Sequence, residues 1–252
     1  MSNPFRERLN KGQVCAGVLT SMPSTNMAQM LSNSGFDWLF IDMEHGAIDI
    51  ASCYNMITAT SGSACSPVVR VMEPSIAITK PVLDSGAMGV IFPMITSKET
   101  AEAAVAAVRY PPAGERGWGP FYAPMRWRKK DSIEYYKSSD DIVIISLIEH
   151  IDEINNIEEI TKVKGIDVFF IAPMDLAASM GYVGDRDHPE VKEAIARAEA
   201  CIKKSHGSLG GLCLSASEGN DKIQNGYQVL LMGFDLLLME VGVRSMLDGL
   251  NR

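Results

Sequence analysis

Short apolar runs rich in β-branched and aromatic residues recur along the chain, and each is followed by a polar turn and an amphipathic stretch. The eight runs are Val14–Leu19, Trp38–Met43, Val68–Met72, Gly89–Ile95, Ile142–Ile148, Val168–Ala172, Gly210–Leu214 and Leu236–Val241. Apolar residues also have the spacing of a helix face at Ala101, Ala104, Val105 and Val108, and again at Val191, Ala194, Ile195, Ala198 and Ile202. Strands that alternate with helices in this way build a parallel sheet.

The runs are almost continuously apolar, as residues 38–41 (WLFI) illustrate, which is typical of strands in a parallel sheet covered on both faces. Eight strand–helix units in about 250 residues suit a closed (β/α)8 barrel, the TIM barrel. A doubly wound open sheet is the structural alternative, but GVLTSMPST after the first run lacks the G-x-G-x-x-G fingerprint of dinucleotide-binding sheets. We therefore predict an α/β protein with one barrel domain over residues 1–252.

One connection is much longer than the others. Between Phe92 and Leu147 lies the segment RYPPAGERGWGPFYAPMRWRKK, rich in glycine, proline and aromatic residues. Because connections of this length in compact domains usually serve a function, we predict a functional loop.

Composition and charge remove several classes of function. The net charge is −8 and the cations are scattered, so the basic surface that binds nucleic acid is missing. The most apolar stretch, Val229–Val243, contains Asp235 and Glu240 and is too short to span a membrane. The N-terminal residues have no apolar segment typical of a secretory signal, so we expect a cytoplasmic protein. The five cysteines form no CxxC pair, so we expect neither disulfides nor structural zinc.

Charged residues stand where several predicted strands end, which is where the chemistry of such barrels resides. They are Asp42, Glu44, His45, Arg70, Glu149 and Asp175. Glu149 and Asp175 are 26 residues apart, about one strand–helix unit, so that both carboxylates could bind one hard cation such as Mg²⁺ or Mn²⁺. The alternative is that each acid caps the following helix.

His45 and Arg70 are the other candidates for catalysis. An imidazole at a strand end is a suitable general base, and Asp84 is available to hold its tautomer, although a histidine in an EHG turn can also be a plain surface residue. Arg70 lies in an apolar strand, so its permanent charge needs a substrate oxygen or an acidic partner such as Glu73. No predicted strand contains a lysine, which disfavours an imine mechanism.

Several motifs together resemble the HpcH/HpaI family of metal-dependent 2-oxo-acid aldolases, over roughly residues 5 to 250. They are FDWLFIDMEHG, PVLDSGAMGVIFPMI, RYPPAGERG, IEHIDEINNIEEITKVKGIDVFFIAPMDLAASMGY and the HPEV that follows. The resemblance implies a (β/α)8 barrel that cleaves a 4-hydroxy-2-oxo acid to pyruvate and an aldehyde, and that catalyses the reverse addition. It also implies a role in the catabolism of aromatic compounds.

The resemblance assigns a role to each candidate residue. His45 is the general base, Asp84 raises its basicity, and Arg70 stabilises the enolate oxygen. The metal ligands are Glu149 and Asp175, with Mg²⁺ or Mn²⁺ as the ion and Co²⁺ or Zn²⁺ as further candidates. The substrate-binding set is Arg70, Leu147, Met174, Asp175 and Leu212, where backbone N–H groups of Met174 and Asp175 hold the pyruvate carboxylate.

The chain departs from the family pattern at three places. Leu147 stands where a glutamine that contacts the substrate is common, Ala172 replaces a glycine, and Glu240-Val241-Gly242 stands where a Gly-x-Asp is common at the last strand. Relatives form hexamers, trimers of dimers with an exchanged C-terminal helix, so we expect a homo-oligomer in which the tail from Val241 is that helix.

The substrate and the reaction keep alternatives. Leu147 and a largely aromatic set of loop residues predict a bulky apolar or aromatic aldehyde; alternatively, the loop residues pack a subunit interface. The loop residues are Trp118, Phe121, Tyr122, Met125 and Trp127. An oxaloacetate decarboxylase or macrophomate-synthase-like enzyme would use the same site. A non-catalytic barrel that binds a 2-oxo acid is a third interpretation, and cleavage of acyl-CoA esters lacks a basic cluster for the CoA tail.

Overall fold

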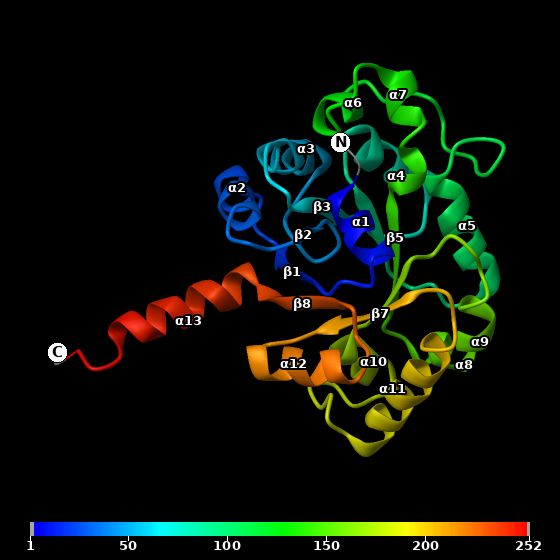
Figure 1. Cartoon of the computed structure of the whole chain (residues 1–252). Helices are drawn as coiled ribbons and strands as arrows, with labels where there is room; N and C mark the ends of the chain where they lie inside the picture. The colour runs from blue at the N-terminus through cyan, green and yellow to red at the C-terminus, as the bar shows by residue number, and fades with distance from the viewer. Residues whose placement is uncertain (1–2, 251–252) are drawn as a thin grey trace.

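A computed structural model describes residues 3–250, and its centre is a closed barrel of eight parallel strands hydrogen-bonded in sequence order (Figure 1). The strands are β1 (Cys15–Thr20), β2 (Trp38–Asp42), β3 (Ser66–Arg70), β4 (Gly89–Phe92), β5 (Val143–Ile148), β6 (Val168–Ile171), β7 (Ser208–Leu212) and β8 (Val229–Phe234). Pairing of β1 with β8 closes the barrel. The predicted (β/α)8 fold is therefore confirmed.

The helices mostly follow a strand and pack around the barrel, but the first precedes β1 and the last extends away from the barrel (Figure 1). They are α1 (Pro4–Asn10), α2 (Thr25–Ser32), α3 (Ile50–Ala59), α4 (Ile76–Asp84), α5 (Lys98–Val108), α6 (Ala123–Arg126), α7 (Ser132–Tyr136), α8 (Ile151–Asn155), α9 (Ile157–Ile160), α10 (Pro173–Ser179), α11 (Pro189–Ile202), α12 (Ala216–Gln224) and α13 (Asp235–Leu247). Both helices predicted from apolar spacing, α5 and α11, are present. Within residues 3–250, no helix has the length and apolarity needed to cross a membrane.

Two layers of apolar side chains hold the barrel together. One lies between strands and helices, and the other fills the inside of the barrel around Trp38, Phe40 and Phe170. All residues of β2 are buried because both faces of the strand are covered. Gly17 of β1 lies against the Trp38 ring, and a Cβ there would stand 2.2 Å from a ring carbon, so only glycine fits beside this indole.

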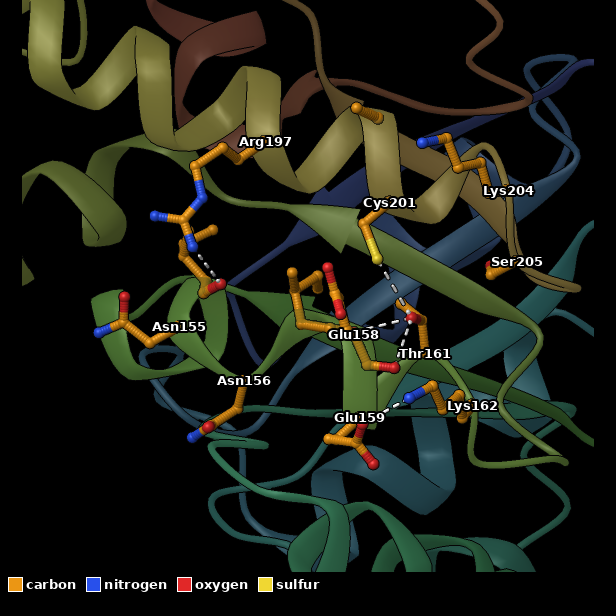
Figure 2. Close-up of a pocket in the computed structure, with 13 residues that line it drawn as sticks. Asn155, Asn156, Glu158, Glu159, Thr161, Lys162, Arg197, Cys201, Lys204 and Ser205 are labelled. Carbon is orange, nitrogen blue, oxygen red and sulfur yellow. Dashed lines mark hydrogen bonds and ion pairs between the residues drawn. The ribbon is translucent and has the colours of Figure 1, made fainter.

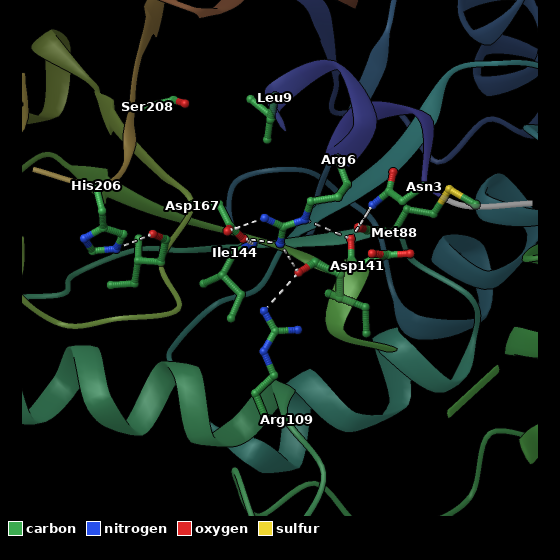
Figure 3. A network of polar contacts seen from close by, with 12 residues as sticks. Asn3, Arg6, Leu9, Met88, Arg109, Asp141, Ile144, Asp167, His206 and Ser208 are labelled. Carbon is green, nitrogen blue, oxygen red and sulfur yellow. Dashed lines mark hydrogen bonds and ion pairs between the residues drawn. The ribbon is translucent and has the colours of Figure 1, made fainter. Parts of the chain in front are cut away.

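The N-terminal helix α1 closes the end of the barrel where the strands begin. Phe5 stacks on Trp38 with 5.6 Å between ring centroids. Figure 3 shows Arg6 reaching the Asp167 carboxylate, where Nη2 donates to Oδ2 at 2.6 Å and to the Ile142 carbonyl at 2.9 Å. This end of the barrel is therefore filled by protein, and a substrate must enter from the opposite end.

The last predicted strand is wrong. Residues 236–241 lie in α13, and the eighth strand is β8, which ends seven residues before the predicted end. The two segments form one continuous apolar stretch, whose pattern does not separate a buried strand from a helix. The break between them comes from Gly233, whose φ of +86° turns the chain at the end of β8.

A tertiary contact of Asp235 fixes the start of α13. Its carboxylate is buried and accepts hydrogen bonds from the Thr20 hydroxyl at 2.9 Å and from the backbone N–H groups of Ser21 and Met22. The barrel thus joins the end of β8 to the end of β1. The Gly-x-Asp expected at the last strand is present as Gly233 to Asp235, so the departure assigned to Glu240-Val241-Gly242 does not exist.

The long aromatic connection does not lie at the end of the barrel where the strands finish. It joins the end of α5 to the start of β5, so it leaves the barrel at the end where the strands begin. It contains the short helices α6 and α7, and it packs on the outer side of the barrel, where the Tyr122 ring contacts the Tyr54 ring of α3. Trp127 is fully buried against Tyr135 and is a core residue.

Candidate active site

A cavity of about 150 Å³ opens at the end of the barrel where the strands finish. Six residues predicted from the sequence line it: His45, Arg70, Leu147, Met174, Asp175 and Leu212. The remaining wall is apolar and comes from Leu19, Phe40, Phe170, Leu231 and Phe234, with Ala172 and Pro173 beside Met174. The barrel therefore gathers residues from seven of its strands around one small space.

Arg70 is held by two acids. Its Nε donates to Asp42 Oδ1 at 2.8 Å, Nη2 donates to Asp42 Oδ2 at 2.6 Å, and Nη1 lies 3.0 Å from Glu44 Oε2. Burial alone lowers the pKa of Arg70, but the hydrogen bonds and charge of Asp42, with the charge of Glu44, raise it above its usual value. The guanidinium is thus a fixed positive charge in the cavity wall, and the proposed partner Glu73 is not needed.

Asp42 is a residue for which the sequence predicted no role. The register of β2 and β3 places Asp42 directly beside Arg70. Its Oδ1 also accepts the backbone N–H groups of Glu44 at 3.0 Å and His45 at 3.2 Å, which folds the EHG turn back on the strand. One pattern in the sequence could have identified Asp42: it is an acid at the end of a strand, just before the EHG turn, and the next strand ends in an arginine.

Glu149 follows β5 directly and is buried, close enough to interact electrostatically with Asp175 of the cavity wall. Its Oε1 accepts the backbone N–H of Met94 at 3.0 Å. The pKa of Glu149 is raised to about 7, chiefly by burial and further by the negative charges of Glu44 and Asp175. The hydrogen bond from Met94 and the positive charge of Arg70 act in the opposite direction and lower the pKa. The two predicted metal ligands are therefore near enough to repel each other, in a site whose nearby guanidinium is already paired.

The donors present fit a divalent cation of the hard type. Glu149 and Asp175 come from neighbouring strand ends and offer carboxylate oxygens, the ligands that Mg²⁺ and Mn²⁺ prefer. Among residues 3–250, no group of three or more His, Cys, Asp or Glu side chains forms a metal site. If Glu149 and Asp175 hold the ion, they supply two ligands and leave coordination positions for water and substrate, unlike the closed set of a structural zinc site.

The turn that carries Glu149 contains a second buried acid. Glu153 is completely buried in α8, and its Oε2 accepts the backbone N–H groups of Glu149 and His150. Burial raises the pKa of Glu153 to about 8.

Asp84 lies away from His45 within one chain. It is at the C-terminal end of α4, and its Oδ1 accepts a hydrogen bond from Arg116 Nη2 at 2.7 Å. It lines a cavity of about 380 Å³ on the outer side of the barrel, together with the exposed Trp118, Phe121 and Tyr122. A strand-end position could be predicted for His45 but not for Asp84, because helices run back along the barrel and end at its other side.

The same placement concerns the aromatic loop, for which the sequence left a substrate-binding role and a subunit interface as alternatives. Its exposed rings lie beside α3 and α4 and do not line the cavity of their own chain, which leaves Leu147 as the supporting residue for an apolar acceptor there. Leu19 and Phe234 add to that apolar wall and were not singled out in the sequence.

A larger cavity of about 600 Å³ lies between α8, α9 and α11 on the outer side of the barrel (Figure 2). Two of its charged groups have partners: Lys162 pairs with Glu159, and Arg197 Nη2 donates to the Ile154 carbonyl at 3.3 Å. Because the residues predicted from the sequence line the strand-end cavity and not this one, the strand-end cavity is the candidate active site.

Comparisons with known proteins identify the family of the chain. The family model described as HpcH/HpaI aldolase/citrate lyase matches residues 17–240. The chain is 37% identical over 241 residues to 2-keto-3-deoxy-L-rhamnonate aldolase of Escherichia coli K12, covering 94% of this chain and 89% of that protein. The crystal structure of an HpcH/HpaI aldolase/citrate lyase family protein from Burkholderia cenocepacia J2315 has a TM-score of 0.90 at 29% identity, with 98% of each chain covered. Macrophomate synthase has a TM-score of 0.87 at 23% identity, covers 96% of this chain and 87% of its own, and is similar in fold alone.

Proposed function

Because the chain belongs to the HpcH/HpaI aldolase/citrate lyase family, we propose that it is a carbon–carbon lyase that cleaves a 4-hydroxy-2-oxo acid to pyruvate and an aldehyde. The observation that carries the proposal is the strand-end cavity. It combines a fixed cation, Arg70, with a base, His45, and an acid, Asp175, beside the buried Glu149. The reverse reaction, addition of pyruvate to an aldehyde, uses the same groups.

Glu149 and Asp175 would hold a divalent cation, Mg²⁺ or Mn²⁺ by the hardness of their oxygens, with Co²⁺ and Zn²⁺ as alternatives. When bound, such an ion acts as a Lewis acid toward the 2-oxo group. Arg70 adds its positive charge, which opposes the negative charge that develops on the C2 oxygen. Met174 and Asp175 are in the first turn of α10, where backbone N–H groups lack helical acceptors and suit the substrate carboxylate.

His45 is the base of the proposed cleavage. It takes the proton of the 4-hydroxyl group, the C3–C4 bond breaks, and its electron pair forms the C2–C3 double bond of the enolate while C4 leaves as the aldehyde. Protonation of C3 then gives pyruvate. His45 is exposed at the cavity rim, where it can exchange its proton with water after each turnover.

The first test needs no knowledge of the aldehyde. Proton NMR of pyruvate in D₂O with the purified protein is expected to show loss of the methyl signal with Mg²⁺ or Mn²⁺ and none with EDTA, with Mn²⁺ removed before recording. Absence of exchange with each of these ions would contradict the proposal. Release of carbon dioxide from oxaloacetate without pyruvate exchange would favour the decarboxylase.

The cavity wall indicates the kind of aldehyde. Leu147 is buried and lines the cavity together with Arg70 and the apolar residues Leu19 and Phe234. An apolar wall offers no hydrogen bonds to a hydroxylated acceptor, which would lose its bonds to water on entry. We therefore propose an apolar aldehyde as acceptor.

We compare the kcat/KM for propanal with the kcat/KM for glycolaldehyde. Substitution of Leu147 by glutamine is expected to lower the propanal-to-glycolaldehyde ratio by about tenfold. The two aldehydes are of similar size, and only glycolaldehyde carries a hydroxyl group that the new amide can bind. Pyruvate addition assays with each aldehyde give this ratio for the wild type and for the variant. A ratio equal to that of the wild type would show that this wall does not choose the acceptor.

The chain also offers surfaces for assembly. Figure 1 shows α13 extending away from the barrel, and many of its apolar residues are exposed, among them Leu236, Met239, Val243 and Met246. Such a face needs a partner, which supports a homo-oligomer with an exchanged C-terminal helix, a hexamer as trimer of dimers. In that arrangement, the action of Asp84 on His45 that the family implies would come from a second copy. Light scattering of the purified protein measures the number of chains, and a monomer would contradict this part.

A further inference from the structure

The position of Glu149 depends on two turns that meet beside it. The first is the turn after β4, where Met94 donates its N–H to Glu149 Oε1 at 3.0 Å. Met94 has a φ of +55°, a left-handed conformation that is rare for residues other than glycine, so the backbone is strained where it meets the acid. Asn156 Nδ2 donates to the Thr96 carbonyl at 2.8 Å and joins this turn to the end of α8.

The second turn is held by Glu153. Its Oε2 accepts the N–H of Glu149, the residue that carries the candidate ligand, and the N–H of His150 at 2.9 Å. Glu149 is thus bonded at both ends, at its carboxylate by Met94 and at its own backbone by Glu153. Neither bond involves the second carboxylate oxygen of Glu149.

Burial separates Glu153 from an ordinary helix cap. The chain contains a matching pair at the end of β7, where Leu214 donates its N–H to Glu218 Oε2 at 2.9 Å, four residues ahead, as Glu149 does to Glu153. The Glu218 side chain is 31% exposed, whereas Glu153 is 0% exposed. A buried carboxylate is unfavourable, so a cap that could be built with an exposed acid does not by itself explain Glu153.

We infer that Glu153 is a positioning residue for metal binding: its buried carboxylate fixes the turn after β5 so that Glu149 presents an oxygen to a divalent cation. The inference rests on the proposed function. Partners that orient a ligand affect affinity because a misplaced ligand must be ordered when the metal binds.

The test is the affinity for Mn²⁺, measured by the EPR signal of the free ion without substrate. Glu153→Met removes the acceptor at similar size in an apolar setting and is expected to raise the Mn²⁺ dissociation constant about 10- to 100-fold. Glu153→Gln keeps an oxygen that accepts both N–H groups and is expected to bind close to wild type. Glu218→Met removes the matching cap and is expected to leave the affinity unchanged.

Circular dichroism and thermal melting establish that each variant is folded, and Glu153→Ala serves if Glu153→Met is not. Wild-type affinity in the folded Glu153→Met variant would overturn the inference, as would an equal loss in Glu218→Met. If the wild type binds Mn²⁺ and exchanges pyruvate while all variants bind alike, only this inference fails. If the wild type does neither, the proposed function fails with it.

Discussion

Replacement of Glu149 by glutamine is expected to lower metal-dependent pyruvate exchange by about 10³-fold, because a neutral amide no longer attracts the cation whose Lewis acidity contributes several kcal/mol. The amide oxygen can still accept the Met94 N–H, so the turn keeps its shape. The measurement is the decay of the pyruvate methyl signal in D₂O at saturating Mg²⁺. Exchange within tenfold of the wild type would exclude Glu149 as a ligand.

The same variant is expected to melt at an equal or higher temperature than the wild type in EDTA. The pKa of Glu149 is raised in the folded protein from 4.5 to about 7, chiefly by burial, so ionisation of this group opposes folding. That penalty is absent below pH 4.5, grows as pH rises, and is complete above about pH 7. The gain in melting temperature over the wild type should therefore be larger at pH 8 than at pH 5, and the reverse order would contradict the burial argument.

Replacement of Arg70 by lysine is expected to lower pyruvate exchange by about 10²- to 10³-fold. The guanidinium makes three contacts in a fixed plane, two with Asp42 and one with Glu44, and a single ammonium cannot reproduce them. Its charge would move toward Asp42 and away from the place where the enolate oxygen forms. The exchange rate at saturating pyruvate and metal measures this effect.

Arg126 provides the matched control for a buried arginine. Its Nε donates to the Thr60 hydroxyl at 2.9 Å and Nη2 to the Cys65 carbonyl at 3.2 Å, outside the site. Arg126→Lys is expected to lower the melting temperature and leave exchange unchanged. If both variants lost exchange to the same extent, the loss would come from general disturbance of the barrel.

Seven strands were predictable because apolar runs bounded by polar turns have few other interpretations. The eighth was not, since Val229–Val243 is apolar on both sides of the true boundary. The turn at Gly233 and the contact of Asp235 with the end of β1, more than 200 residues away in sequence, separate strand from helix there.

The candidate site was predictable to the extent that it follows strand ends. His45, Arg70, Leu147 and Asp175 all line the cavity, because parallel strands finish at one end of a barrel. The position of Asp84 could not be predicted in this way, because Asp84 ends a helix and not a strand. It contacts Arg116, away from the end of the barrel where the strands finish. The role of Asp42 depends on strand register, which a single sequence does not contain.

The sequence by itself determined the alternation of strands and helices, the closed barrel and the set of polar residues at its open end, because hydrophobic periodicity and chain order are local properties. The tertiary structure decided which of these residues touch. In it, Arg70 pairs with Asp42, Glu153 accepts the backbone N–H of Glu149, and the aromatic loop packs on the outer side of the barrel. These outcomes depend on register, on the direction of helices and on contacts between distant segments, and they arise only when the chain closes on itself.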